Sequence, residues 1–130
     1  MTFVLHRVPT PPAPDAPPEP LVLAAAALGA EVLTELYGHD DFSEDAAAAV
    51  VRLHGTPYHE ASAWVALPVG LSPDACSPGD ALGVAWLDRG LADDLQVAEV
   101  HVQVRADLRR RGLGAALYGA AAEVARADGR

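Results

Sequence analysis

The chain has 130 residues, enough for one domain with a single modest hydrophobic core. Half of its residues are apolar, which excludes a disordered chain, and its formal net charge of −9 argues against general binding to nucleic acid or anionic membranes. All nine basic residues are arginine and six of them fall within residues 105–130, so one basic segment stands out in an acidic chain.

The N-terminal third predicts one strand, a spacer and a helix. Residues 2–8 (TFVLHRV) are short and rich in β-forming side chains. Residues 9–20 contain seven prolines, which exclude a helix interior or a central strand and predict an extended spacer. Residues 21–37 predict a helix, with Gly38 as its C-terminal stop. Its apolar face is predicted to consist of Leu21, Leu28, Val32 and Leu36.

A second helix and three strands follow. Asp41-x-x-Glu44 resembles a capping box that opens a helix ending at His54. The inner face of this helix is predicted to hold Ala46, Val50 and Leu53. Strands are predicted over residues 61–69, 81–87 and 95–104, with Asp88-Arg89-Gly90 as the exit from the second strand.

The last strand and the helix after it have clear periodicities. Along the strand, valines at 100, 102 and 104 alternate with polar residues at 99, 101 and 103, so the two sets face opposite sides. The helix has a buried stripe made of Leu113, Leu117, Ala120, Ala121 and Val124, and Gly129 is its expected stop. The order β-α-α-β-β-β-α predicts a mixed α/β domain.

Three consecutive arginines, Arg109 to Arg111, precede this helix where its dipole carries about half a positive charge. Acidic residues are preferred there, so the arginines are unfavourable unless an anion binds. Gly112 and Gly114 would let an anion approach the free amides of the first turn. The pattern therefore predicts a phosphate or diphosphate site. A Walker A loop does not fit because the chain has no lysine, and Leu117 stands where a dinucleotide fingerprint needs glycine.

The run VHVQVRADLRRRGLGAALYGAAAEVARADGR resembles the central motif of the GNAT superfamily of N-acyltransferases. Arg109-x-x-Gly112-x-Gly114 matches the R/Q-x-x-G-x-G/A signature of that family, and its strand and helix frame match as well. Ala106 departs from the proline that is common at the turn. The alanine-rich, lysine-free style is similar to that of actinobacterial members. The resemblance implies a GNAT-like, mostly antiparallel sheet flanked by helices. It also implies that residues 1–130 form a partial domain ending after the cofactor-binding helix.

The resemblance implies acetyl transfer from acetyl-CoA to a primary amine. The strand backbone and the loop would bind acetyl-CoA through Val102, Gln103, Val104, Arg109, Arg110, Arg111, Gly112, Leu113, Gly114 and Ala115. A general base would remove the amine proton, and Glu99 and His101 are the candidates because both lie on the polar face of the right strand. The loop at residues 38–41 resembles the region that admits the amine, which would be a small molecule or a peptide.

Other interpretations remain open at this point. The chain can be a non-catalytic acyl-CoA-binding module that supports a second GNAT half or a homodimer, or a nucleic-acid-binding piece that uses its arginines. The single cysteine, Cys76, forms no disulfide within the chain and has no CxxC partner for zinc, so no metal is expected. We see no signal peptide, and the apolar stretch 21–30 is too short to span a bilayer, so a cytoplasmic protein is expected.

Overall fold

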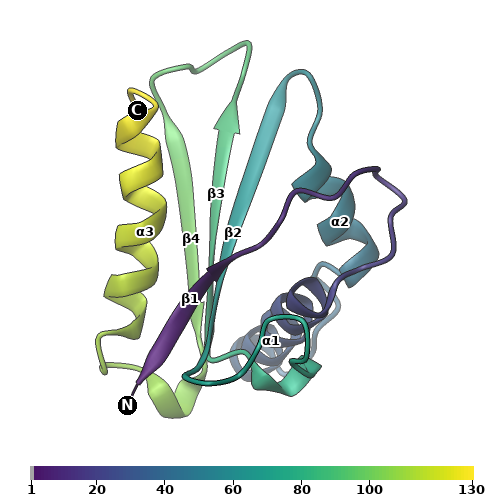
Figure 1. Ribbon diagram of the computed structural model, residues 1–130, viewed down its shortest axis with the longest axis vertical. Coiled ribbons are helices and arrows are strands. Elements are labelled where there is room, and N and C mark those ends of the chain that lie inside the picture. The colour runs from purple at the N-terminus through teal and green to yellow at the C-terminus, as the bar shows by residue number, and fades with distance from the viewer. Residues whose placement is uncertain (1) are drawn as a thin grey trace.

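The computed structural model describes residues 2–130 as a four-stranded sheet with helices on both faces (Figure 1). In chain order its strands and helices are β1 (Phe3–Arg7), α1 (Pro20–Tyr37), α2 (Ala46–His54), β2 (His59–Pro68), β3 (Gly83–Gly90), β4 (Ala98–Val104) and α3 (Leu113–Ala127). Two 3-10 turns are η1 (Pro78–Asp80) and η2 (Ala106–Leu108). The predicted α/β class and the predicted order of strands and helices are confirmed.

The sheet has the order β1-β2-β3-β4, and each neighbouring pair is antiparallel. Strands that follow one another in the chain are therefore neighbours in the sheet, even though α1 and α2 lie in the connection between β1 and β2. The register places Trp64 opposite Ala85 and Trp86 opposite His101. Strands β1 and β4 form the two edges among the described residues.

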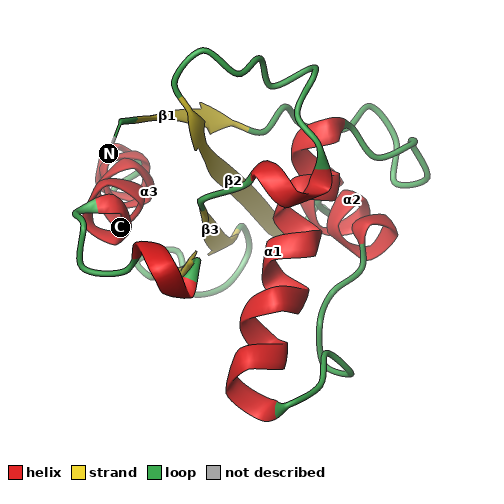
Figure 2. Cartoon of the chain, turned by 90° about the horizontal axis from the view of Figure 1, so that it is seen from below, coloured by secondary structure: helices red, strands yellow, loops and turns green. Residues whose placement is uncertain are grey.

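The two faces of the sheet are covered by different helices, with α3 on one face and α1 and α2 on the other (Figure 2). Alternation along β2 divides its side chains between two cores. Ala63 and Val65 pack with α1 and α2, whereas Trp64 and Ala66 pack with α3. The valines of β4 also pack toward α3, so the polar side chains of β4 lie on the opposite face, and the predicted division of β4 into an apolar and a polar face is confirmed.

Helix α1 begins at Pro20, which occupies the first turn, and ends at Gly38, whose φ of 80° is left-handed. The predicted inner face is wrong at Leu36, which is 61% exposed, because the last turn of α1 projects beyond the sheet (Figure 2). Among the described residues, α1 alone is long and apolar enough to cross a membrane by length and composition. Core helices and signal sequences share that property, and the buried residues of α1 belong to the core beneath the sheet.

The predicted capping box of α2 is wrong. The helix begins at Ala46, and its cap is Asp45, whose Oδ1 accepts a hydrogen bond from the Ala48 amide at 2.8 Å. Asp45 directly precedes the alanine run, so its carboxylate reaches the third helical amide. Asp41 instead lies beside His39 in the loop. The predicted inner face of α2 is confirmed: Val50 and Leu53 are buried, and Ala46 packs against the same core.

Strand boundaries differ from prediction where charged residues lie inside the sheet. Asp88-Arg89-Gly90 was predicted to leave the second of the three strands, but β3 continues to Gly90. Both charges are neutralised within the fold: Asp88 bonds to Arg52 and His59, and Arg89 bonds to Glu60. Strand β4 begins at Ala98 and not at residue 95, because residues 95–97 belong to the turn after β3.

Candidate functional site

The segment between β4 and α3 leaves a long row of backbone amides without partners. Within residues 2–130, no group accepts a hydrogen bond from the amides of residues 109–115. Every helix leaves its first few amides free, and residues 113–115 supply those of α3. The additional amides come from the loop, where Arg110 and Gly112 have left-handed φ angles of 67° and 83°. A row of this kind at a helix N-terminus is a favourable anion site.

Two glycines have different functions in this loop. Gly112 is exposed, and a Cβ on it would meet nothing within 4 Å, so its positive φ, and not crowding, favours glycine. Gly114 faces the sheet, where an added Cβ would lie 3.7 Å from Val104 Cγ2. Gly112 therefore allows the sharp change of direction, and Gly114 lets α3 lie close to β4.

Helices α2 and α3 differ in whether a side chain caps the N-terminus. Helix α2 is capped by the Asp45 carboxylate, whereas α3 has Gly112 at its N-cap and no side-chain cap. Each arginine next to a helix N-terminus costs several tenths of a kcal/mol, and an acid there gains a similar amount. A bound anion would complete the start of α3 as Asp45 completes the start of α2.

The three loop arginines have different surroundings. Arg109 is fully engaged: its terminal nitrogens donate to the Glu35 carboxylate at 2.7 and 3.2 Å, and its Nε donates to the Val104 carbonyl at 3.3 Å. Arg110 and Arg111 are exposed, and no carboxylate of residues 2–130 lies within ion-pair distance of either. These two guanidinium groups are available to an anion beside the amides.

The backbone of β4 has an open edge next to this loop. The Arg105 amide donates to the Leu82 carbonyl at 3.1 Å, which makes the flanking pair Val104 and Gly83 a non-hydrogen-bonded pair. The amides and carbonyls of Val102 and Val104 therefore point away from β3. The Arg109 bond to the Val104 carbonyl agrees with this direction. Two residues of the predicted backbone site thus present hydrogen-bonding groups at the edge, and the third, Gln103, is paired with β3.

The predicted bases Glu99 and His101 lie side by side on the polar face of β4, with His101 Nε2 at 3.5 Å from Glu99 Oε2. Their side chains are 72% and 58% exposed. The two residues line different cavities. His101 and Gln103 line one of about 280 Å³, whereas Glu99 lines a second of about 320 Å³ with Asp88 and His59.

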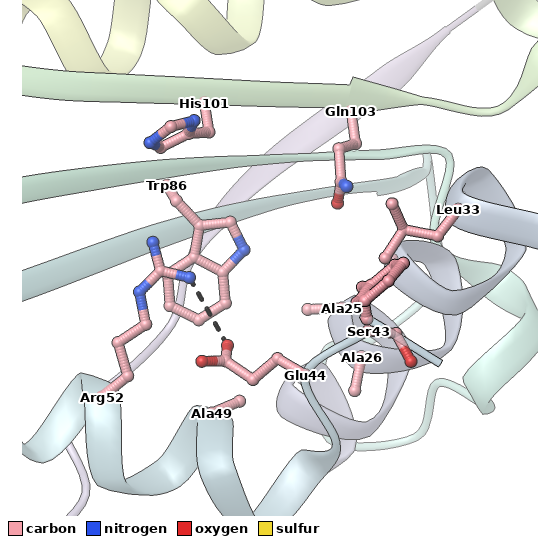
Figure 3. Close-up of a pocket in the computed structure, with 12 residues that line it drawn as sticks. Ala25, Ala26, Leu33, Ser43, Glu44, Ala49, Arg52, Trp86, His101 and Gln103 are labelled. Carbon is pink, nitrogen blue, oxygen red and sulfur yellow. Dashed lines mark hydrogen bonds and ion pairs between the residues drawn. The ribbon is translucent and has the colours of Figure 1, made fainter. Parts of the chain in front are cut away.

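The first cavity lies between β4 on one side and α1, α2 and their connecting loop on the other (Figure 3). Trp86 of β3 forms its back wall, and the Arg52 guanidinium stacks on that indole at 4.1 Å from the ring centroid. Arg52 is held in place by two hydrogen bonds to Asp88 and one to Glu44. A cation–π contact together with a bidentate carboxylate makes this wall rigid.

The electrostatics of this wall centre on Asp88. Burial by itself raises the pKa of Asp88, but hydrogen bonds and charge from Arg52, with a contribution from His59, outweigh it, so the pKa lies below its usual value. Asp88 therefore stays ionised at neutral pH and compensates Arg52. For Arg52, burial by itself lowers the pKa, but hydrogen bonds and charge from Asp88 and Glu44 outweigh it, so the pKa of Arg52 lies above its usual value.

Sequence reasoning missed most of this cavity. Trp86 and Asp88 share one face of β3, and Arg52 reaches both from α2, a contact between distant segments that no local pattern reveals. Glu44 was interpreted as part of a cap and instead lines the cavity. The sequence did indicate the region of this cavity, because the loop at residues 38–41 was expected to admit substrate. That loop lies just before the lining residues 42–44.

Cys76 and the acidic residues form no metal centre in the described part of the chain, where no group of three or more His, Cys, Asp or Glu could hold a metal ion. Cys76 is buried in the core beneath α1, and its Sγ donates to the Pro73 carbonyl at 3.5 Å. Burial, assisted by nearby Asp80, raises the pKa of this thiol, so it is a packing residue of low reactivity.

Comparisons with protein-family models, with curated proteins and with solved structures give no match to this chain. The structure by itself therefore establishes the α/β fold with an antiparallel sheet. The features that bear on function are the loop, the edge of β4 and the cavity.

Proposed function

We propose that the protein is an N-acyltransferase with a GNAT-like fold that moves an acetyl group from acetyl-CoA to a primary amine. The observation that carries this proposal is the row of amides at residues 109–115, which have no partner within residues 2–130 and are flanked by the exposed side chains of Arg110 and Arg111. A diphosphate supplies several acceptor oxygens and the negative charge that this helix start lacks.

The position of this row supports acyl-CoA over other diphosphates. The loop directly continues β4, whose open edge presents backbone groups at Val102 and Val104. A pantetheine arm contains two amides and can pair with such an edge as a strand does. The thioester would then lie along β4, next to the cavity that His101 and Gln103 line.

The chemistry follows from this arrangement. The lone pair of a neutral amine attacks the thioester carbonyl, a C–N bond forms, and the C–S bond breaks with its electrons on sulfur. The proton lost by the amine passes to a base and then to the departing thiolate. His101 is the better base of the two because it lines the cavity, and Glu99, at 3.5 Å from it, would stabilise its protonated form. Positioning and backbone donors supply the rest of the rate enhancement.

One observation favours a second candidate, a non-catalytic acyl-CoA-binding module. Both candidate bases are more than half exposed, whereas catalytic acids and bases usually lie in desolvated sites. Such a module would present its open β4 edge to a second GNAT half or to a second copy of the chain. Either form is proposed to work in the cytoplasm, without a metal, a membrane or nucleic acid.

The test is a calorimetric titration with acetyl-CoA, with S-acetyl-pantetheine, which lacks the diphosphate, and with single-stranded DNA. We expect acetyl-CoA to bind at least tenfold more tightly than S-acetyl-pantetheine, because charge-assisted hydrogen bonds contribute about 1.5–3 kcal/mol each. The double variant Arg110→Ala/Arg111→Ala should lose that advantage. Arg126→Ala, on the exposed last turn of α3, is the control for net charge.

Equal affinity for the two thioesters would remove the diphosphate site and with it the acyltransferase. Tighter binding of DNA than of acetyl-CoA at moderate salt would favour the nucleic-acid interpretation. If acetyl-CoA binds but thiol release stays at background with a panel of amines, the non-catalytic module is the better description.

A further inference from the structure

The cavity beside β4 has chemically distinct sides (Figure 3). His101 and Gln103 reach in from β4, and Glu44 and Arg52 approach from the opposite side, on α2 and the loop before it. Most of the remaining wall is apolar, with Leu33, Phe42 and Trp86 as its large side chains, and Ser43 adds one hydroxyl beside Glu44. The volume of about 280 Å³ suits a small ligand with a short hydrocarbon body.

The charges of this cavity do not cancel. Arg52 gives Asp88 two hydrogen bonds, from Nε and from a terminal nitrogen, and this pair neutralises itself. Glu44 holds Arg52 by a single contact of 3.4 Å, and its side chain is 36% exposed. One carboxylate is therefore in excess, it is weakly held, and it borders the cavity. Asp40 and Asp41, exposed in the loop before it, add to the negative potential.

An excess carboxylate in this position does not suit the reacting nitrogen. Attack on a thioester requires a neutral amine, and a carboxylate that binds this nitrogen stabilises its ammonium, which has no lone pair to offer. The reacting nitrogen belongs at β4, where His101 can accept its proton. Glu44, across the cavity, suits a second nitrogen that stays charged during the reaction.

From these positions we infer that the acyl acceptor is an aliphatic diamine. One amino group lies at β4 beside His101, the second binds Glu44 as an ammonium, and the methylene chain lies along Leu33, Ala26 and Trp86. In the transfer, the C–N bond forms at the first nitrogen and the thioester C–S bond breaks. The proton passes through His101 to the CoA thiolate, and the second ammonium keeps its proton throughout. This inference rests on the proposed acetyl transfer.

The test compares three amines of equal chain length with acetyl-CoA saturating: 1,4-diaminobutane, butylamine and 4-aminobutyrate. We expect kcat/KM for the diamine to exceed that for butylamine by about tenfold, since a charge-assisted bond to Glu44 is gained, and 4-aminobutyrate to be the poorest substrate. Glu44→Gln should abolish the preference for the diamine, so that kcat/KM for the diamine falls to the value for butylamine in the same variant. Glu31→Gln is the matched control, because Glu31 is an exposed acid of α1 outside the cavity.

A binding measurement makes the test independent of turnover. The chain has two tryptophans, and only Trp86 lines the cavity, so in a Trp64→Phe background the fluorescence reports diamine binding at this wall. We expect saturable quenching by the diamine that Glu44→Gln weakens about tenfold. Absence of this quenching, equal use of diamine and butylamine, or a diamine preference that survives Glu44→Gln would each overturn the inference. Acetyl-CoA binding and transfer to other amines would still stand in those cases, whereas failure of acetyl-CoA to bind would overturn the proposed function itself.

Discussion

Replacing Gly112 by leucine separates ligand binding at the loop from the stability of the fold. Gly112 has φ of 83°, and a Cβ there meets no heavy atom within 4 Å, so the side chain adds backbone strain without a clash. An L-residue in the left-handed region costs about 1–2 kcal/mol. For a domain of this size, each kcal/mol lowers Tm by about 3–5 °C.

Gly38 supplies a closely matched control. It ends α1 with φ of 80°, is exposed, and also leaves an added Cβ without neighbours. Gly38→Leu should therefore lower Tm by nearly the same amount as Gly112→Leu. Only Gly112→Leu places a bulky group over the amides of residues 109–115.

Acetyl-CoA affinity is expected to separate the two variants. Loss of one hydrogen bond from a backbone amide to a charged phosphate oxygen weakens binding by about 1.5–3 kcal/mol, or about 10–100-fold in Kd. Calorimetric titration and thermal unfolding of both variants give the comparison. Unchanged affinity in Gly112→Leu, or an equal loss in both variants, would refute the assignment of the phosphate loop.

Three further variants test the support that Glu99 is proposed to give the base His101, the packing of the sheet and the pH dependence of stability. Glu99→Gln should lower kcat with little change in the Kd for acetyl-CoA; a loss of affinity would move Glu99 out of the proposed proton pathway. Gly83→Ala places a Cβ 2.7 Å from a leucine methyl of α3 and 3.1 Å from a β4 carbonyl, so unfolding should show a destabilisation of about 1–3 kcal/mol, against near neutrality for Gly79→Ala, where the space is open. Asp88 has a lowered pKa when folded, so its stabilising effect is full above the unfolded pKa of about 4 and disappears as the pH falls through the folded value. Asp88→Asn should therefore be less stable than wild type at pH 7, because Arg52 loses its partner, and the difference should shrink below about pH 4 in denaturant unfolding; a difference independent of pH would contradict the ion pair.

Local patterns predicted most of the fold. Period-two alternation located β4 and assigned its two faces, and the stripe from Leu113 to Val124 identified the buried face of α3. Gly38 ends α1 as expected, in a left-handed conformation that favours glycine, with its amide bonded to the Thr34 carbonyl. These features depend on neighbours in sequence, and sequence patterns contain that information.

The prediction failed where long-range contacts decide. Asp88 and Arg89 were predicted to lie in a loop because charged side chains are unfavourable inside a strand. Their partners are on α2, on β2 and just after the end of α3, and the local sequence does not indicate them. The sequence offered Asp41 as the cap of α2, whereas the cap is Asp45, about one helical turn later in the chain. The candidate anion loop could be proposed from sequence because its amides, glycines and arginines are contiguous, whereas the cavity could not, because its walls come from four elements.

The Arg109 side chain joins three parts of the molecule that a cofactor would have to engage. From the loop that is proposed to hold phosphate, it bonds both to Glu35, near the end of α1, and to the Val104 carbonyl at the edge of β4. An anion that also bound Arg109 would compete with Glu35 for the same guanidinium, so the proposed cofactor binding would be thermodynamically linked to the freedom of the C-terminal turn of α1. That turn leads into the loop that borders the cavity proposed to bind the amine. Binding of the acyl donor at the loop would thus alter access of the amine to the cavity on the polar face of β4. This coupling would favour an ordered reaction in which the acyl donor binds first.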